Sequence, residues 1–261
     1  MASKLRRVFP AVWSNMRPNS PVCSHILLYA CDLLIILHSL DSQFLDNCKI
    51  TKSIVKTFKK GDLICVKVVR DYPSFPWNSI WSAAFNKILD NKLMDFQWRL
   101  SHHVLATGQR IARWGLGGGI CPYVNCNVVE TINHLFWECP RINPVIIWVK
   151  NVFKSLCDDN VDINLNLFLY GFTKEKISHV IFNRIWYTFC ICKFIVWKSR
   201  CIAVFQGTLK SGAQMKSDVI NEIKLRVMAD HSRLSSTRFF NLWVEGNSFV
   251  KIKNQKLVFQ L

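Results

Sequence analysis

The chain has 261 residues, half of them hydrophobic, which excludes disorder throughout and leaves room for one large domain or two small ones. Its formal net charge of +17 favours a polyanionic partner, because basic side chains neutralise phosphates and release bound counterions. Eleven cysteines at irregular spacing do not form the framework of a small secreted domain, so we expect reduced thiols and an intracellular protein, in the nucleus or cytoplasm.

The first part of the chain, residues 1–74, is predicted to form a helical segment. Helices are expected at 22–40 and 42–59, and the β-branched run at 62–70 favours a short strand. The proline-rich loop that follows is the best boundary in the chain, and a second domain is expected over 75–158.

Two apolar stretches test whether the chain enters a membrane. Residues 26–37 are shorter than the roughly 20 residues that span hydrocarbon, and they carry Asp32. Residues 186–197 contain Lys193, and both stretches fit buried bundle helices better. Prolines near the start of the chain interrupt the core of any signal peptide, so neither a membrane segment nor a signal peptide is predicted.

Two further helices are predicted at 77–89 and 91–103. The second carries one apolar face at helical spacing, formed by Leu93, Phe96, Leu100 and His103. Trp98 lies on a second apolar stripe, so Trp98 is expected in the core, as is Trp114. The basic residues of this region are expected to be partly exposed: Arg99, Arg110 and Arg113.

Residues 121–139 contain the pattern C-x4-C-x7-H-x4-C, formed by Cys121, Cys126, His134 and Cys139. Three thiolates and one imidazole suit tetrahedral zinc, and an array this short can be closed by local folding. Turn residues around the first two cysteines indicate a knuckle. The sequence therefore predicts one structural zinc ion with four protein ligands, which leaves no open position for a reactive water.

The second half of the array is predicted to be helical, with Thr131 as its cap. In a continuous α-helix His134 and Cys139 lie roughly 140° apart, which is poor for one metal. Pro140 relieves this, because the residue before a proline avoids the α region, so Cys139 is expected to end the helix. Two other interpretations stay open. They are buried cysteines beside a core histidine, and a Cys-His nucleophile pair, although nothing nearby supplies an orienting Asn or Asp.

The last part of the chain, 159–261, is expected to be helical, with long helices at 174–205 and 217–231. A helix before them begins at Asn143-Pro144 and carries an inward face of Val145, Trp148, Val152 and Leu156. Residues 250–259 partly alternate apolar residues with lysine, as in a hairpin. The predicted fold is mostly α, an irregular helical bundle with an embedded zinc knuckle and at most a small β-hairpin.

Residues around the array carry a resemblance to a known family. They are Pro76-Trp77, Trp81, Asp90-Asn91-Lys92-Leu93, Trp98-Arg99-Leu100-Ser101-His102, Val104-Leu105-Ala106-Thr107, Arg113-Trp114-Gly115, Glu130-Thr131, His134-Leu135-Phe136-Trp137 and Cys139-Pro140. This region resembles the zinc-binding region downstream of the reverse transcriptase in LINE-type non-LTR retrotransposons. Three positions depart from the family pattern: four residues separate the first two cysteines instead of two, Ala106 stands in place of proline, and His103 in place of glycine.

The resemblance implies that the region helps a reverse transcriptase engage its RNA or target DNA, as a piece of a retrotransposon polyprotein. Catalysis is not expected, because polymerases need paired aspartates for two metals. Tyr29-Ala30-Cys31-Asp32 has a cysteine in place of the first aspartate, so its likeness to the polymerase motif is interpreted as coincidence.

The sequence thus predicts a zinc-binding accessory module with RNA or DNA as partner, no small-molecule substrate and no membrane. The oligomeric state is not predicted. Expected phosphate contacts near the knuckle are Arg110, Arg113 and Lys150. Tyr123, at the tip of the knuckle, is either a stacking residue for a base or packed under its loop. The alternatives are a purely structural or interaction domain stapled by zinc, and a non-functional transposon relic.

Overall fold

The computed structural model describes residues 72–113, 115, 117–157, 163–172, 177–254 and 256–260. The chain divides into two compact units, Met1–Asp71 with Val104–Ala106, and Tyr72–His103 with Thr107–Leu261. Apart from Val104–Ala106, every described residue belongs to the second unit. The elements predicted at 22–40, 42–59 and 62–70 lie outside the described residues, as does Trp114. The domain boundaries predicted at 74 and 158 stay predictions.

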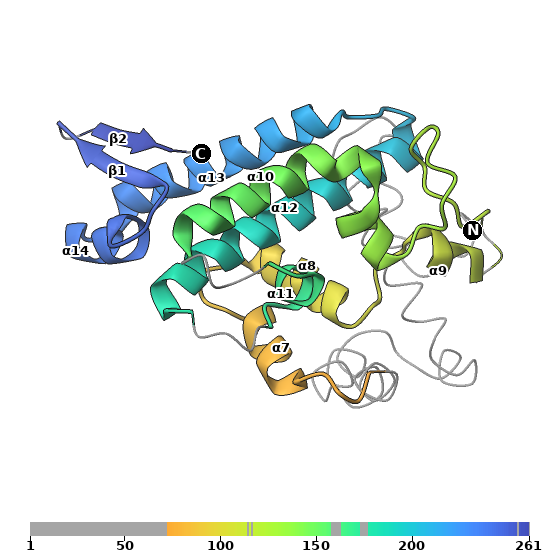
Figure 1. The fold of residues 1–261 in the computed structure, drawn as a ribbon, viewed down its shortest axis with the longest axis horizontal. Helices are drawn as coiled ribbons and strands as arrows, with labels where there is room; N and C mark the ends of the chain where they lie inside the picture. Colours follow the sequence, from red (N-terminus) through yellow and green to blue (C-terminus); the bar gives the residue numbers. More distant parts are fainter. Residues whose placement is uncertain are drawn as a thin grey trace, which may run out of the picture. The chain divides into compact units, whose positions relative to one another are not determined.

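The described part of the chain is mostly helical, which confirms the predicted fold class (Figure 1). The helices are α7 (Trp77–Ala84), α8 (Asn91–Ser101), α9 (Gly108–Arg113), α10 (Asn143–Leu156), α11 (Leu165–Tyr170), α12 (His179–Gln206), α13 (Gly212–Arg233) and α14 (Ser236–Phe239). Two π-helices, η1 (His134–Glu138) and η3 (Phe240–Val244), and a 3-10 helix, η2 (Pro140–Ile142), complete the helical elements. The predicted hairpin is also present, with β1 (Val250–Lys253) antiparallel to β2 (Lys256–Phe259) and Val250 opposite Phe259.

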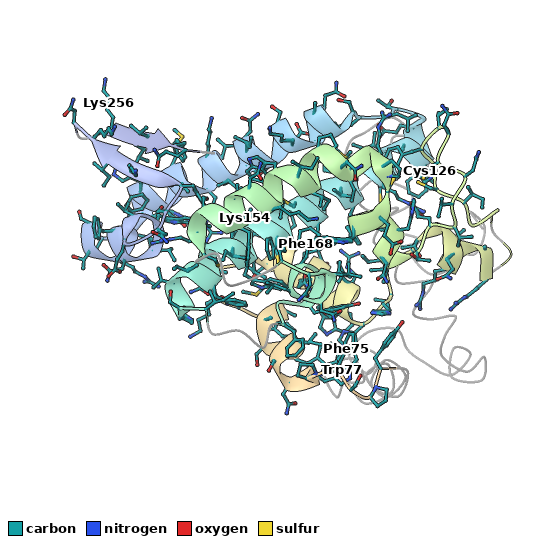
Figure 2. The ribbon with its side chains drawn as sticks, viewed as in Figure 1. Phe75, Trp77, Cys126, Lys154, Phe168 and Lys256 are labelled. Atoms are coloured by element: carbon teal, nitrogen blue, oxygen red, sulfur yellow. The ribbon has the colours of Figure 1, made fainter. Side chains whose placement is uncertain are left out.

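Helix α12 forms the centre of the bundle and contacts α8, α10, α11 and α13. In Figure 1, α10, α12 and α13 run side by side. Apolar residues cover all faces of α12, and most of them are buried, as expected of a helix surrounded by others. The inward face predicted for α10 is confirmed by the burial of Val145, Trp148, Val152 and Leu156. On α13, the buried face includes Val219, Ile223 and Val227. Figure 2 shows Phe168 among the side chains that fill the space between the helices.

Local capping sets the ends of several helices and explains where they differ from prediction. Helix α8 starts as predicted, because the Asp90 side chain accepts a hydrogen bond of 2.9 Å from Leu93 N. It ends at Ser101, and His103 lies beyond it with a φ of 53°. Helix α13 starts earlier than predicted, at a capping box in which Ser211 and Gln214 satisfy each other's backbone N–H groups. Helix α7 ends five residues earlier than predicted, at Ala84.

Three buried polar groups tie the bundle together. The Lys193 ammonium lies in the core of α12 and donates to Gln97 Oε1 at 2.7 Å and to Leu169 O at 2.9 Å. The Arg184 guanidinium is fully buried and donates to four backbone carbonyls around η3, those of Asn241, Leu242, Glu245 and Asn247.

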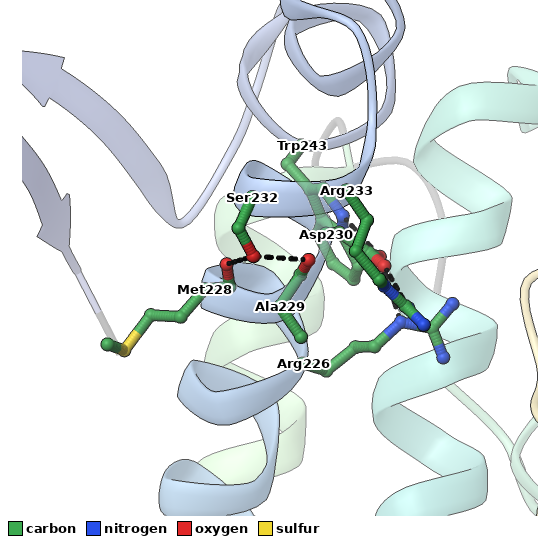
Figure 3. A network of polar contacts seen from close by, with 7 residues as sticks. All are labelled: Arg226, Met228, Ala229, Asp230, Ser232, Arg233 and Trp243. Carbon is green, nitrogen blue, oxygen red and sulfur yellow. Dashed lines mark hydrogen bonds and ion pairs between the residues drawn. The ribbon is translucent and has the colours of Figure 1, made fainter.

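Asp230, near the end of α13, is the third buried group. Its carboxylate accepts from Arg226 at 2.8 Å, Arg233 at 3.0 Å and Trp243 Nε1 at 3.1 Å, as Figure 3 shows. Because these donors come from α13 and η3, the carboxylate joins the end of the bundle to the C-terminal turn.

Candidate metal centre

The first two cysteines of the array lie on a short loop whose ends pair like a small hairpin. Ile120 and Val129 form an antiparallel bridge, and Cys121 N donates to Val128 O at 2.8 Å. The loop then turns tightly, since Cys126 N donates to Tyr123 O at 3.2 Å. Residues Asn125 and Asn127 adopt positive φ angles of 66° and 46°, which asparagine tolerates better than most residues. The predicted knuckle is confirmed in this geometry.

The second two members of the array lie at the two ends of η1. Thr131 Oγ1 accepts from His134 N at 2.9 Å, which confirms the predicted cap. Cys139 leaves the helical region, with φ −64° and ψ 124°, as predicted from Pro140. The predicted α-helix is wrong, however, because Cys139 N donates to His134 O at 2.8 Å and closes a π-turn. The wider i→i+5 turn returns Cys139 onto the carbonyl of His134, which reduces the angular separation that an α-helix would impose.

The four donor atoms converge. Cys126 Sγ lies 3.2 Å from His134 Nε2, 4.0 Å from Cys139 Sγ, and Cys121 Sγ lies 3.9 Å from Cys139 Sγ. All four donor atoms lie within 4.8 Å of one another. A tetrahedral zinc ion has S–S edges of roughly 3.8 Å and S–N edges of roughly 3.5 Å, from its usual bond lengths. The separations and the donor chemistry therefore fit a zinc ion.

The donors are shielded from solvent except at the tip of the loop. Cys121, His134 and Cys139 are buried, and Cys126, which is labelled in Figure 2, is half-buried. Hydrogen bonding from the Cys121 thiol lowers the pKa of Cys139 to about 5, and the same contact raises the pKa of Cys121. This contact favours the thiolate form of Cys139, the form that binds metals.

A buried ion pair fixes the loop to the bundle. Glu130, at the end of the loop, is fully buried and accepts from Arg200 of α12 at 2.7 Å. Its second partner is Gly108 N, at 2.5 Å, at the start of α9. A Cβ on Gly108 would lie 2.8 Å from Gly119 O, so only glycine allows this approach. Sequence analysis missed the pairing of Glu130 with Arg200. The single local indication of this pairing was the presence of an acidic residue, Glu130, directly before the turn that Thr131 caps.

The other predicted site residues do not gather at one point of the knuckle. Arg113 is exposed at the end of α9, and Lys150 is exposed on α10, with Nζ 5.1 Å from the Trp137 ring centre. Arg110 is half-buried and donates from Nη1 to His103 O. Tyr123 is only 3% exposed and has the Arg141 guanidinium 5.4 Å from its ring centre. The packing alternative for Tyr123 therefore holds, and its ring is not accessible for base stacking.

Two other predictions concern the surroundings of the site. Trp98 is half-buried rather than in the core, with its ring centre 4.2 Å from that of His102. The predicted placement of Trp98 in the core is therefore wrong. The cysteines outside the array that the structure describes are buried thiols, as predicted: Cys157, Cys190, Cys192 and Cys201. Among the described helices, none is both long and apolar enough to span a membrane.

The described helices carry a Cys₃His cluster on a knuckle and a π-turn, and this donor set is one that zinc prefers. In agreement, residues 67–148 match the family described as zinc-binding in reverse transcriptase. The chain is also 20% identical over 153 residues to the Transposon TX1 uncharacterized 149 kDa protein of Xenopus laevis. That match covers 56% of this chain and 10% of the relative. No solved structure matches the chain. The predicted resemblance to a retrotransposon reverse-transcriptase zinc-binding region is thus confirmed.

Proposed function

We propose that the chain is a zinc-binding and nucleic-acid-binding accessory module of a retrotransposon reverse-transcriptase polyprotein, with no catalysis of its own. The convergence of four donor atoms, from Cys121, Cys126, His134 and Cys139, within 4.8 Å carries the proposal. Four protein ligands would complete a tetrahedral zinc site and leave no position for a reactive water. When bound, the ion would supply a structural cross-link between the knuckle and the π-turn.

Nucleic acid is the proposed partner because the chain carries a formal charge of +17 and residues 67–148 match a family described as zinc-binding in reverse transcriptase. The proposed phosphate contacts are Arg110, Arg113 and Lys150. Arg113 and Lys150 are exposed, whereas Arg110 already donates to a backbone carbonyl, so Arg110 is expected to contribute least.

The test is a titration of zinc-loaded protein with labelled single-stranded RNA and single-stranded DNA across a range of salt concentrations. Affinity is expected to fall steeply with salt and to depend weakly on sequence. Joint replacement of the three contacts by glutamine is expected to lower the salt slope by up to about three phosphate equivalents, with zinc content unchanged. A control variant removes the same charge at three exposed lysines elsewhere: Lys154, Lys251 and Lys256.

The buried pair of Glu130 and Arg200 favours a second candidate, in which zinc only staples the helices. The same titration separates the two. If zinc-loaded protein binds neither nucleic acid at low salt, the accessory-module proposal is wrong and the structural domain replaces it.

A further inference from the structure

A cavity of about 640 Å³ lies outside the metal centre. Its walls come from the loop after α7, the first turn of α12, the last turns of α13, and the α14–η3 segment. Cavities of this size commonly hold a small ligand or part of a larger one. The zinc site and its proposed phosphate contacts contribute no residue to this cavity.

Basic side chains dominate the charged groups that line the cavity. They are Lys87, Arg226, Arg233 and Arg238, against the single lining carboxylate of Asp230 among the described residues. That carboxylate is 3% exposed and is already paired with Arg226 and Arg233 (Figure 3). Burial opposes the charge of Arg226, but its hydrogen bond with Asp230 outweighs this and raises the pKa of Arg226, and Asp90 lies near enough to add to the effect. A positive excess remains at the mouth of the cavity, where it can attract an anion.

Three of the four basic groups are open to solvent. The Arg233 side chain is 67% exposed and uses one terminal nitrogen for Asp230. Lys87 and Arg238 are exposed, and within the described residues neither side chain makes an ion pair or a hydrogen bond. Side chains that do nothing for the fold are available to a ligand.

An aromatic ring lies beside these charges. Phe85 lines the cavity and is 57% exposed, although phenylalanine is ordinarily buried. Exposed aromatic rings among basic side chains are the combination that binds single-stranded nucleic acid, because bases stack on the ring while phosphates contact the cations. A base in a duplex is already stacked on its neighbours and is not available to such a ring.

We propose that this cavity binds single-stranded nucleic acid, with an unpaired base on Phe85 and backbone phosphates on Lys87, Arg233 and Arg238. The inference rests on the proposed nucleic-acid function and adds a second contact surface, separate from the knuckle. Arg226 and Asp230 act as positioning residues, since their pairing holds Arg233 at the wall of the cavity.

The experiment uses the full zinc-loaded chain and a fluorescein-labelled, mixed-sequence single-stranded RNA, with binding followed by fluorescence anisotropy from low to moderate salt. The double variant Lys87→Gln/Arg238→Gln is expected to reduce the slope of log K against log salt by about 1.4, from two phosphate contacts on a single strand. The control Lys251→Gln/Lys253→Gln removes the same charge from exposed positions on β1. An equal loss in the control would show diffuse attraction and overturn the assignment.

The aromatic contact is tested separately. Phe85→Ala is expected to weaken RNA binding by roughly 5- to 150-fold, and Phe85→Trp to retain it. Phe240→Ala, at a ring that is 47% exposed and does not line the cavity, is the matched control. Inorganic polyphosphate supplies phosphates without bases, so Phe85→Ala should leave its affinity unchanged. Equal losses for RNA and polyphosphate would refute base stacking.

The outcomes separate this inference from the function on which it rests. If the wild-type protein binds neither RNA nor DNA at low salt, both the proposed nucleic-acid function and the cavity inference are wrong. If wild-type protein binds, and the cavity variants bind as tightly while the variant at Arg110, Arg113 and Lys150 loses affinity, the knuckle surface stands and the cavity is not a binding site.

Discussion

Lys193 is a cation in the core of the bundle, and its replacement by methionine tests how the core accommodates it. Burial lowers its pKa from 10.5 to about 8, and the structure gives it two hydrogen-bond acceptors but no carboxylate partner among the described residues. Its ammonium also lies 4.2 Å from the ring centre of Trp186. The unfolded chain therefore holds this proton more tightly than the folded protein does.

The lowered pKa fixes the direction of the pH dependence. Below about pH 8 the folded protein keeps the buried charge at a penalty of about 3 kcal/mol, because burial lowers the pKa of Lys193 from 10.5 to about 8. As pH rises from 8 to 10.5 the folded protein loses the proton first, so the penalty fades and stability increases. Between pH 7 and 10 the contribution of Lys193 to the free energy of unfolding should improve by about 2 kcal/mol.

Lys193→Met removes the penalty together with two hydrogen bonds. Leu169 O keeps a hydrogen bond of 2.7 Å from Gln97 Nε2, so the loss is expected to be about 1–2 kcal/mol. The variant should therefore be more stable than wild type at pH 7 by about 1–2 kcal/mol, and the difference should shrink and reverse by pH 10. Urea unfolding at several pH values measures this difference, and Lys198→Met, at an exposed position on α12, is the control. Parallel stability curves, or a Met variant less stable at pH 7, would refute the reasoning.

Other expected outcomes concern the metal centre and its supports. Native mass spectrometry should find one zinc per chain, and mild chelation should release this zinc and expose three reactive thiols. The absence of zinc from protein that was purified under reducing conditions would contradict this prediction. Cys139→Ser should abolish stoichiometric zinc binding, whereas Cys157→Ser, at a buried thiol outside the array, should leave the metal content unchanged. Arg200→Ala should lower the free energy of unfolding by about 3–5 kcal/mol, because Glu130 would remain buried without its cation; a loss under 1 kcal/mol in urea unfolding would mean that water replaces it. Trp98→Ala should lower the free energy of unfolding by about 1–2 kcal/mol, which is less than the loss expected at the fully buried Trp186. A melting series of Trp98→Ala and Trp186→Ala compares the two sites.

The array itself was predictable because its chemistry is local. Cysteine and histidine spacing, the Thr131 cap and the effect of Pro140 all act within a few residues, and each is found in the structure. The π-turn was not predictable, since the sequence of His134–Glu138 fits i→i+4 and i→i+5 closure equally well. Its hydrogen bond from Cys139 N to His134 O depends on how the turn docks.

Contacts between residues far apart in the chain could not be predicted from the sequence, for a different reason. Glu130 and Arg200 are seventy residues apart, and nothing in either segment marks the other as its partner. The prediction for Trp98 was wrong for a similar reason. An apolar stripe shows that a helix has a second apolar face, but it does not show which element packs against that face. The helix that contains Lys193 was predicted to be buried, yet its acceptors Gln97 and Leu169 lie on other elements.

The contact of Arg184 with the carbonyls of residues 241–247 limits how the protein can be divided. A shortened version that stops before Asn241 would leave a guanidinium sealed inside the bundle with none of these acceptors. Such a fragment is expected to aggregate or unfold even though every zinc ligand is retained. Attempts to isolate the knuckle as a minimal unit should therefore keep α12, which also carries the Arg200 partner of Glu130, together with the C-terminal turn.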